Sequence, residues 1–432
     1  MINKIYNRIN YSKALEWSKL IAITGGAQII IQLISLISGI LVIRLLSTQE
    51  YAFYTLTNVV LGTITILADG GITSSVMAQG GKVWQNSDLL GKTISTGFDL
   101  RKKFGFVSIL ISLPILFYLL HHHGASLLMS FLISISIIPA FISALSGTLL
   151  EVVFKLRQDI LPLQKIQVGN NIGRLVLVAI SLFLFPYTFL AIIAAGISQI
   201  WANWQLRKKA AAYVDWQQKP DQIIQKEILE FVKRVLPNSI YYCISGQIAI
   251  WLISIFGSTE GVAEIGALGR LVVIMTIFSV LFSTLIIPRF ARMPDEKKLL
   301  MSKYIQIILG LVLLSGIIVI SVWLFSDQLL FILGANYEHL KDELVLSMVA
   351  SCISLISGIA FSLYTSRGWA IHPVIAIPIN ILFIIMAILI YNVTTIEGIL
   401  YMNILIAFSQ LLLNASYCLI KIMNIKNNSI NG

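Results

Sequence analysis

Charged residues are scarce in this sequence, and so is cysteine. Only 12% of the 432 residues are charged while 57% are hydrophobic, whereas soluble globular domains carry about 25% charged residues. This composition excludes a soluble globular protein. The three cysteines, Cys243, Cys352 and Cys418, fall in different apolar segments without metal-ligand spacing, so we interpret them as buried packing thiols.

Catalytic and cofactor motifs are also missing. The sequence has no glycine-rich nucleotide loop and no His/Cys cluster with metal-ligand spacing. His121-His122-His123 is a lone histidine triplet, which is a weak metal signature. The longest segment expected on the outer side, Ser326–Leu344, is too short to hold a catalytic surface. We therefore expect neither an enzyme nor a bound cofactor or metal.

What the sequence has in abundance is long apolar stretches, of which there are twelve. About 20 mostly apolar residues cross roughly 30 Å of hydrocarbon as a helix, and runs of this length exclude a barrel of short alternating strands. The sequence predicts an all-α polytopic membrane protein with about twelve transmembrane helices. The predicted spans are approximately 20–43, 51–77, 104–120, 125–150, 166–185, 187–205, 237–256, 265–287, 304–325, 345–364, 371–391 and 396–420.

The basic residues lie on one side of this predicted bundle. When the connecting segments are assigned alternately to two sides, the side with both termini collects 27 of the 31 Lys and Arg, and the other side only Arg44 and Lys341. Short cytoplasmic loops carry such an excess, so both termini are predicted to be cytoplasmic. Because these residues flank apolar spans, the net charge of +11 does not indicate nucleic acid. The first apolar run is too long for a cleavable signal peptide.

A long basic segment after the sixth span divides the sequence into halves. We predict a six-helix bundle over residues 1–206, a linker over 207–235 and a second six-helix bundle over 236–432. Within the linker, Ile223–Val235 has the pattern of an interfacial amphipathic helix. Ser47-Thr48-Gln49-Glu50 in the first half is echoed by Ser258-Thr259-Glu260 in the second. Two such halves share one orientation, which is typical of a transporter with its cavity between parallel repeats.

Two arginines fall inside apolar spans and are candidate binding residues. Arg174 lies nine residues past Lys165, or about 14 Å along a helix, a depth at which Arg needs a partner or a wet cavity. Its fork of donors suits a phosphate group; the alternative is snorkelling or a structural pair. Arg270 lies about six residues inside the eighth span, a depth from which a long side chain partly escapes.

Asp69 is a candidate coupling residue. It precedes Gly70-Gly71 within the second span, where two glycines can break a helix and let a carboxylate line a cavity. Asp69 would then take up a proton or Na⁺, or pair with Arg174 at similar depth. The alternative is a packing role for the glycines and a snorkelled carboxylate.

Uncharged polar residues occupy corresponding positions in the first span of each half. They either line a shared cavity or form interhelical hydrogen bonds. The candidate substrate-binding residues among them are Gln28, Gln32, Tyr242 and Gln247.

Several short motifs together resemble a known family. They are Arg44-Leu45-Leu46-Ser47-Thr48-Gln49-Glu50-Tyr51-Ala52-Phe53-Tyr54, Ala68-Asp69-Gly70-Gly71, Leu236-Pro237, Glu264-Ile265-Gly266-Ala267 and Ile287-Pro288-Arg289. The chain resembles the bacterial polysaccharide exporters, the O-antigen and capsule repeat-unit flippases of the multidrug/oligosaccharidyl-lipid/polysaccharide superfamily. Gly266 departs from the pattern, because relatives often carry Tyr there.

The resemblance implies a MATE-like, V-shaped pair of six-helix bundles around a cationic cavity. It implies a flippase that moves an undecaprenyl-diphosphate-linked oligosaccharide from the cytoplasmic to the periplasmic leaflet by alternating access, with proton or cation coupling. Arg174 and Arg270 would then hold the diphosphate or acidic sugars, Asp69 would take part in coupling, and a polysaccharide polymerase would be a partner. The alternatives are a drug/cation antiporter of the same superfamily and a non-transporting membrane scaffold for glycan synthesis. Two intramembrane Arg against one Asp favour an anionic cargo.

Overall fold

The protein is described here by a computed structural model. It covers residues 25–425 except 288, 289, 291, 292, 295, 366, 368, 370 and 372, and it leaves out the side chains of 234, 235, 238, 239, 242–244, 283–285 and 373. The chain divides into two compact units, which we call unit 1 (Met1–Ile248) and unit 2 (Ala249–Gly432). The predicted bundle and linker boundaries stay predictions.

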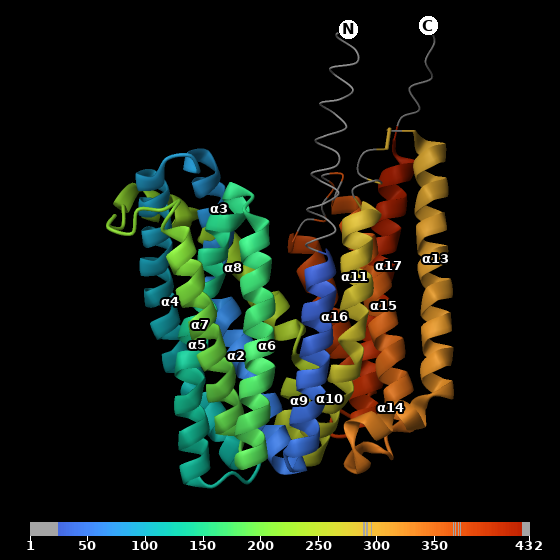
Figure 1. The fold of residues 1–432 in the computed structure, drawn as a ribbon. Coiled ribbons are helices and arrows are strands. Elements are labelled where there is room, and N and C mark those ends of the chain that lie inside the picture. The colour runs from blue at the N-terminus through green and yellow to red at the C-terminus, as the bar shows by residue number, and fades with distance from the viewer. Residues whose placement is uncertain are drawn as a thin grey trace, which may run out of the picture. The chain divides into compact units, whose positions relative to one another are not determined.

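Helices make up the regular structure of both units over the described residues (Figure 1). Unit 1 contains a first helix, Gly25–Leu45, and then α2 (Thr48–Asp69), α3 (Ile72–Val83), α4 (Ser87–His122), α5 (Leu127–Arg157), α6 (Ile160–Leu184), α7 (Thr188–Ala210) and α8 (Gln222–Ser245). At the boundary and through unit 2 follow α9 (Ile248–Phe256), α10 (Thr259–Val272), α11 (Ile274–Leu285), α13 (Lys297–Leu324), α14 (Ser326–Leu333), the 3₁₀ turn η1 (Ala335–Tyr337), α15 (Lys341–Thr365), α16 (Pro373–Ile390) and α17 (Ile396–Met423).

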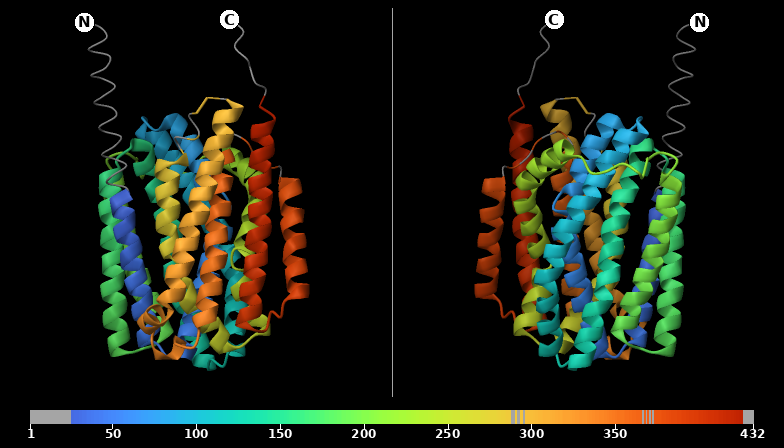
Figure 2. Two further views of the ribbon diagram at one scale, coloured as in Figure 1. Left: turned by 90° about the vertical axis from the view of Figure 1, so that its right-hand side faces the viewer. Right: turned by 90° about the vertical axis from the view of Figure 1, so that its left-hand side faces the viewer.

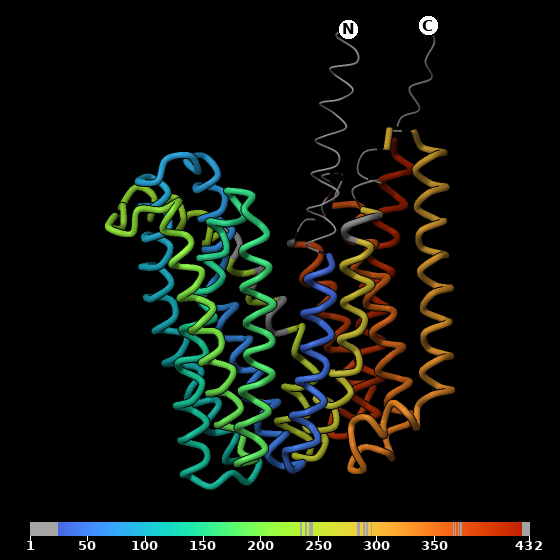
Figure 3. Tube along the Cα trace, in the orientation of Figure 1, coloured from blue at the N-terminus to red at the C-terminus, as the bar shows by residue number. Residues whose placement is uncertain are grey.

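The predicted class, an all-helical polytopic membrane protein, is confirmed. Nine helices in the described part are long and apolar enough to cross a membrane, and α10 and the start of α11 pass the same test only when taken together, as a pair bent by 40°. Val374–Ile390 is a shorter apolar helix. The predicted second span is divided into α2 and α3, and the predicted seventh span into the end of α8 and α9 (Figure 3).

The repeated Ser-Thr motif lies at the start of a helix in each unit. The Ser47 hydroxyl accepts a hydrogen bond from the backbone N–H of Glu50 at the start of α2. The Ser258 hydroxyl accepts one from Gly261 at the start of α10. Serine at this position satisfies a backbone donor that the first helical turn leaves free. Both motifs are therefore helix N-caps.

The core of unit 1 lies where α3, α4, α5, α7 and α8 meet. Its buried side chains include Val76, Ile94, Leu149, Leu206 and Val232. Val232 and Ile228 belong to α8, so the amphipathic stretch predicted as an interfacial helix is helical and packs its apolar face into this core. A helix with one apolar face can bury it against lipid or against protein, and the tertiary structure selects protein.

Two of the three cysteines lie in unit 2, and both are buried free thiols. They are Cys352 on α15 and Cys418 on α17. The side chain of Cys243 lies outside the described residues. The packing interpretation is thus confirmed for Cys352 and Cys418.

Candidate functional site

Asp69 lies at the break between α2 and α3. It is the last residue of α2, and Gly70 and Gly71 follow with φ of 49° and 97°. Glycine adopts these left-handed conformations without the steric cost of a Cβ. The turn brings Thr73 back to Asp69, whose Oδ1 accepts hydrogen bonds from the Thr73 backbone N–H at 3.1 Å and its hydroxyl at 2.5 Å.

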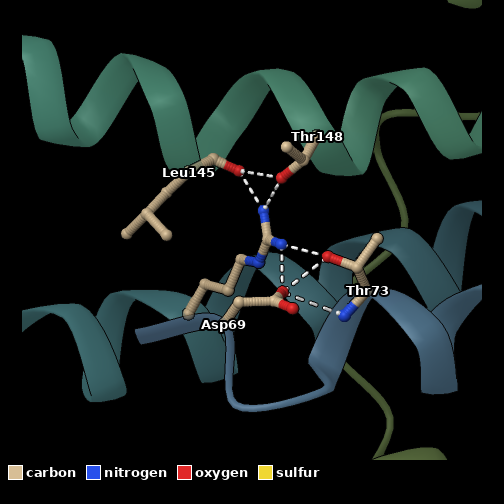
Figure 4. Close-up of polar contacts among 5 residues, drawn as sticks. Asp69, Thr73, Leu145 and Thr148 are labelled. Atoms are coloured by element: carbon tan, nitrogen blue, oxygen red, sulfur yellow. Dashed lines mark hydrogen bonds and ion pairs between the residues drawn. The ribbon is translucent and has the colours of Figure 1, made fainter. Parts of the chain in front are cut away.

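Arg101 on α4 forms an ion pair with Asp69 (Figure 4). Its side chain is only 3% exposed. Besides Asp69, the guanidinium donates to the Thr73 hydroxyl, to the backbone carbonyl of Leu145 and, at 2.6 Å, to the hydroxyl of Thr148. The last two acceptors belong to α5, so one side chain joins the α2–α3 break to α4 and α5.

This pair corrects two expectations. Asp69 pairs with Arg101, and the alternative pairing with Arg174 is wrong. The predicted third span begins at residue 104 and leaves Arg101 in the basic segment before it, yet α4 begins at Ser87 and includes Arg101, Lys102 and Lys103. Successive residues point about 100° apart around a helix, so Arg101 is buried while Lys102 and Lys103 are exposed.

Arg174 ends a polar stripe along α6. Gln167, Asn170, Asn171 and Arg174 are spaced i, i+3, i+4 and i+7, which places them on one helix face. Arg174 is half-buried, and its Nη2 donates to the hydroxyl of Tyr54 on α2 at 3.5 Å. Its Nε is buried without a hydrogen-bond partner among the described residues. Within the described residues, Arg174 therefore has an Nε–H donor that no acceptor in the stripe satisfies.

Amide side chains extend the stripe to α5 and α7. The Gln167 amide donates to Glu151 at 2.8 Å, and the Asn170 amide donates to Gln199 at 2.7 Å. Gln199 donates to Asn203, which donates to the carbonyl of Ser143. Sequence reasoning singled out Arg174 and missed this network, although the polar i, i+3, i+4, i+7 spacing within an apolar helix was its available signal.

The other predicted site residues do not join these clusters in the described contacts. Gln28 and Gln32, on the helix Gly25–Leu45, and Gln247, between α8 and α9, are half-buried. The Tyr242 side chain lies outside the described residues. Arg270 belongs to unit 2, in the last turn of α10 just before the bend into α11, where a cation complements the helix dipole.

Unit 2 contains a polar contact between titratable side chains that the sequence did not indicate. Glu264 on α10 is 5% exposed, and its Oε1 lies 2.7 Å from Nε2 of His339, which follows η1. The two residues are 75 positions apart in sequence. The described residues contain no group of three or more His, Cys, Asp or Glu that could hold a metal ion, the His121–His123 triplet included.

No family model matches the chain, and no curated protein matches it in sequence. Solved structures do match. An inward-facing multidrug resistance MATE family transporter of the MOP superfamily aligns with a TM-score of 0.67 over 92% of this chain and 96% of that one, at 15% identity. The chain has the fold of the MATE transporters.

Two further structures support this assignment of the MATE fold. An outward-facing multidrug resistance MATE transporter aligns with a TM-score of 0.63 over 94% of this chain and 95% of that one, at 15% identity. The eukaryotic MATE transporter AtDTX14 aligns with a TM-score of 0.60 over 95% and 99%, also at 15% identity. The MATE-like architecture implied by the resemblance is therefore confirmed as a fold.

Proposed function

We propose that this protein is a secondary transporter that moves its cargo by alternating access. The supporting observation is that the chain aligns, over more than nine-tenths of its length, with both an inward-facing and an outward-facing MATE transporter. A chain that fits both conformations of one fold is suited to switching between them.

We take an anionic lipid-linked oligosaccharide as the first candidate cargo. A diphosphate does not cross hydrocarbon bare, and a guanidinium in a polar stripe lowers that barrier. Arg174 has such a setting, with a buried Nε that no described residue accepts from. In this proposal the protein is a flippase of the bacterial inner membrane with cytoplasmic termini, and it works beside a polysaccharide polymerase.

The second candidate is a drug/cation antiporter, and the MATE relatives favour it because two of them are described as multidrug resistance transporters. Binding a cationic drug calls for an available carboxylate. On the membrane helices of unit 1, Asp69 is engaged by Arg101, and Glu151 by Lys155 and Gln167. These contacts favour the anionic cargo in unit 1, whereas unit 2 has the buried carboxylate of Glu264, so the two candidates need a direct test.

Replacement of Arg174 tests the cargo. Arg174→Ala removes charge-assisted hydrogen bonds that contribute about 1.5–3 kcal/mol each, so flipping should fall roughly 10- to 100-fold, while Arg174→Lys should keep part of it. The measurement is complementation of a flippase-null strain at matched expression. Lys298→Ala, which removes an exposed positive charge from α13, is the control and should leave activity unchanged.

The competing cargo has its own readout in the same variants. Each is expressed in a strain lacking drug efflux, and susceptibility to cationic drugs is measured. Protection by the wild-type chain that survives in Arg174→Ala, together with no complementation by the wild type, would establish the antiporter and reject the flippase. Full complementation by Arg174→Ala would reject the role of Arg174 alone.

A further inference from the structure

A cavity of about 750 Å³ opens on unit 1 beside the far end of the amide network, since Ser143 and Asn203 both line it. It lies over α5, with α4 on one side and α7 on the other, and the segment between α7 and α8 closes one end. That segment crosses the start of α4 (Figure 2, right). The cavity is therefore at the end of the bundle where α4 begins and α5 and α7 end, which is the basic side of the protein.

The segment that closes the cavity is held in place. The backbone N–H of Asp215 donates to the carbonyl of Ser87 at 3.2 Å, and that of Asp221 donates to the hydroxyl of Thr96 at 2.9 Å. A Cβ at Gly91 would collide with the carbonyl oxygen of Asp215, so the segment reaches α4 only because residue 91 is glycine. These contacts give the cavity a fixed wall.

The inner part of the cavity is mainly apolar, although two serines and Asn203 also line it, and it is open to the outside of the helices. Ile142 is 56% exposed, Ile200 49% and Trp204 58%, and all three line it. Exposed apolar side chains on a membrane helix contact lipid chains. Ile200 precedes Arg207 by seven residues, so the apolar part extends about 10 Å inward from the level of the basic residues.

The outer part of the cavity is positively charged. Lys102 of α4 and Arg207 of α7 line it, and neither has a carboxylate within ion-pair distance among the described residues. The lining carboxylate, Asp99, pairs with Lys103 at 2.7 Å. Arg207 also lies over the ring of Trp216 at 5.2 Å, which keeps the guanidinium at the cavity.

A further acidic residue, Asp215, lies on the segment that closes the cavity but is not among the residues that line it. Asp215 accepts hydrogen bonds from the Gln217 backbone N–H at 2.9 Å and the Gln218 side chain at 2.6 Å. These bonds, the first above all, lower the pKa of Asp215. The Asp215 carboxylate therefore stays ionised, and its hydrogen bonds hold it within its own turn, outside the cavity lining.

We propose that this cavity binds one anionic phospholipid of the surrounding leaflet, with the phosphate between Lys102 and Arg207 and the acyl chains over Ile142 and Ile200. Two cations at headgroup level above an apolar, laterally open groove match an amphiphile with a charged head. A free phosphate ion would leave the apolar part unfilled. This inference does not depend on the identity of the transported cargo.

Native mass spectrometry of the full-length protein in detergent tests the site, with phosphatidylglycerol and phosphatidylcholine as probes. Wild type should retain one phosphatidylglycerol in preference to phosphatidylcholine. Because each basic residue at an anionic headgroup contributes about fivefold, the double variant Lys102→Ala/Arg207→Ala should weaken phosphatidylglycerol binding about 30-fold. The matched control Lys82→Ala/Lys209→Ala removes the same charge from exposed positions outside the cavity and should bind like wild type.

A second variant tests whether lipid binding needs the open volume of the cavity as well as its positive charge. Ser146→Phe fills the cavity while both cations remain, and it should also lose the bound lipid. Glycerol 3-phosphate, which has the headgroup chemistry without acyl chains, should not displace the lipid from wild type. Equal retention of the two lipids by wild type, an unchanged preference in the double variant, or displacement by glycerol 3-phosphate would each overturn the proposal.

Discussion

At the residue scale, the guanidinium of Arg101 connects several helices of unit 1. Arg101 is almost completely buried and has acceptors on the α2–α3 break and on α5. Removal of one partner from a buried ion pair leaves an uncompensated charge and typically costs about 3–5 kcal/mol, whereas replacing both partners is often nearly neutral. Asp69 and Arg101 should therefore behave as a unit.

Single and double replacement of this pair should show that coupling. Arg101→Met should lower the thermal unfolding temperature of the full-length protein in detergent, because the partly buried carboxylate of Asp69 loses its partner, at a cost of up to about 3 kcal/mol. Asp69→Asn/Arg101→Met should recover part of the loss. A single variant as stable as wild type would refute the structural role of the pair.

The same double variant separates that role from ion coupling. If Asp69 takes up the coupling ion, the double variant should fold well but lose the dependence of transport on a pH or Na⁺ gradient. Gradient dependence that survives in this variant would rule out the coupling role proposed for Asp69.

At the element scale, the break between α2 and α3 decides where Asp69 lies. Gly70-Gly71 in an apolar run predicts a helix break, and the structure confirms it. The sequence did not reveal what the break faces, since Arg101 lies 32 residues further on. Gly71 contributes most to the stability of the turn, because its φ of 97° is costly for any residue with a Cβ.

Alanine substitutions at Gly71 and Gly62 should therefore have different effects on the stability of the protein. Gly71→Ala should destabilise the protein by about 1–2 kcal/mol, because it forces a left-handed conformation on an L-residue. Gly62→Ala is the matched control, since a Cβ there meets open space, and it should be neutral or stabilising by up to about 1 kcal/mol. Thermal unfolding of both variants provides the comparison; a Gly71→Ala variant as stable as Gly62→Ala would contradict it.

At the scale of the whole molecule, the distribution of basic residues predicts how the chain lies in the membrane. Moving Arg101 from a loop into the bundle leaves 26 Lys and Arg on one side against Arg44 and Lys341 on the other. Orientation follows the excess of Lys and Arg in short cytoplasmic loops. Losing one residue from 27 does not change the predicted orientation.

Single-cysteine labelling in a background without the native cysteines tests this orientation. A cysteine replacing Asp342, exposed at the start of α15, should react with a membrane-impermeant maleimide in intact cells. One replacing Lys209, exposed at the end of α7, should react only after permeabilisation. The reverse pattern would show the opposite orientation.

The helical membrane class, the approximate spans and the break at Gly70-Gly71 could be predicted from the sequence alone. These features depend on hydropathy, length and local backbone preference, which act between neighbours in sequence. Only the tertiary structure decided that Arg101 is the partner of Asp69, that α8 packs into the core of unit 1, and that Lys102 and Arg207 line one cavity. Those contacts join residues from different helices, and their register depends on how all the helices pack together.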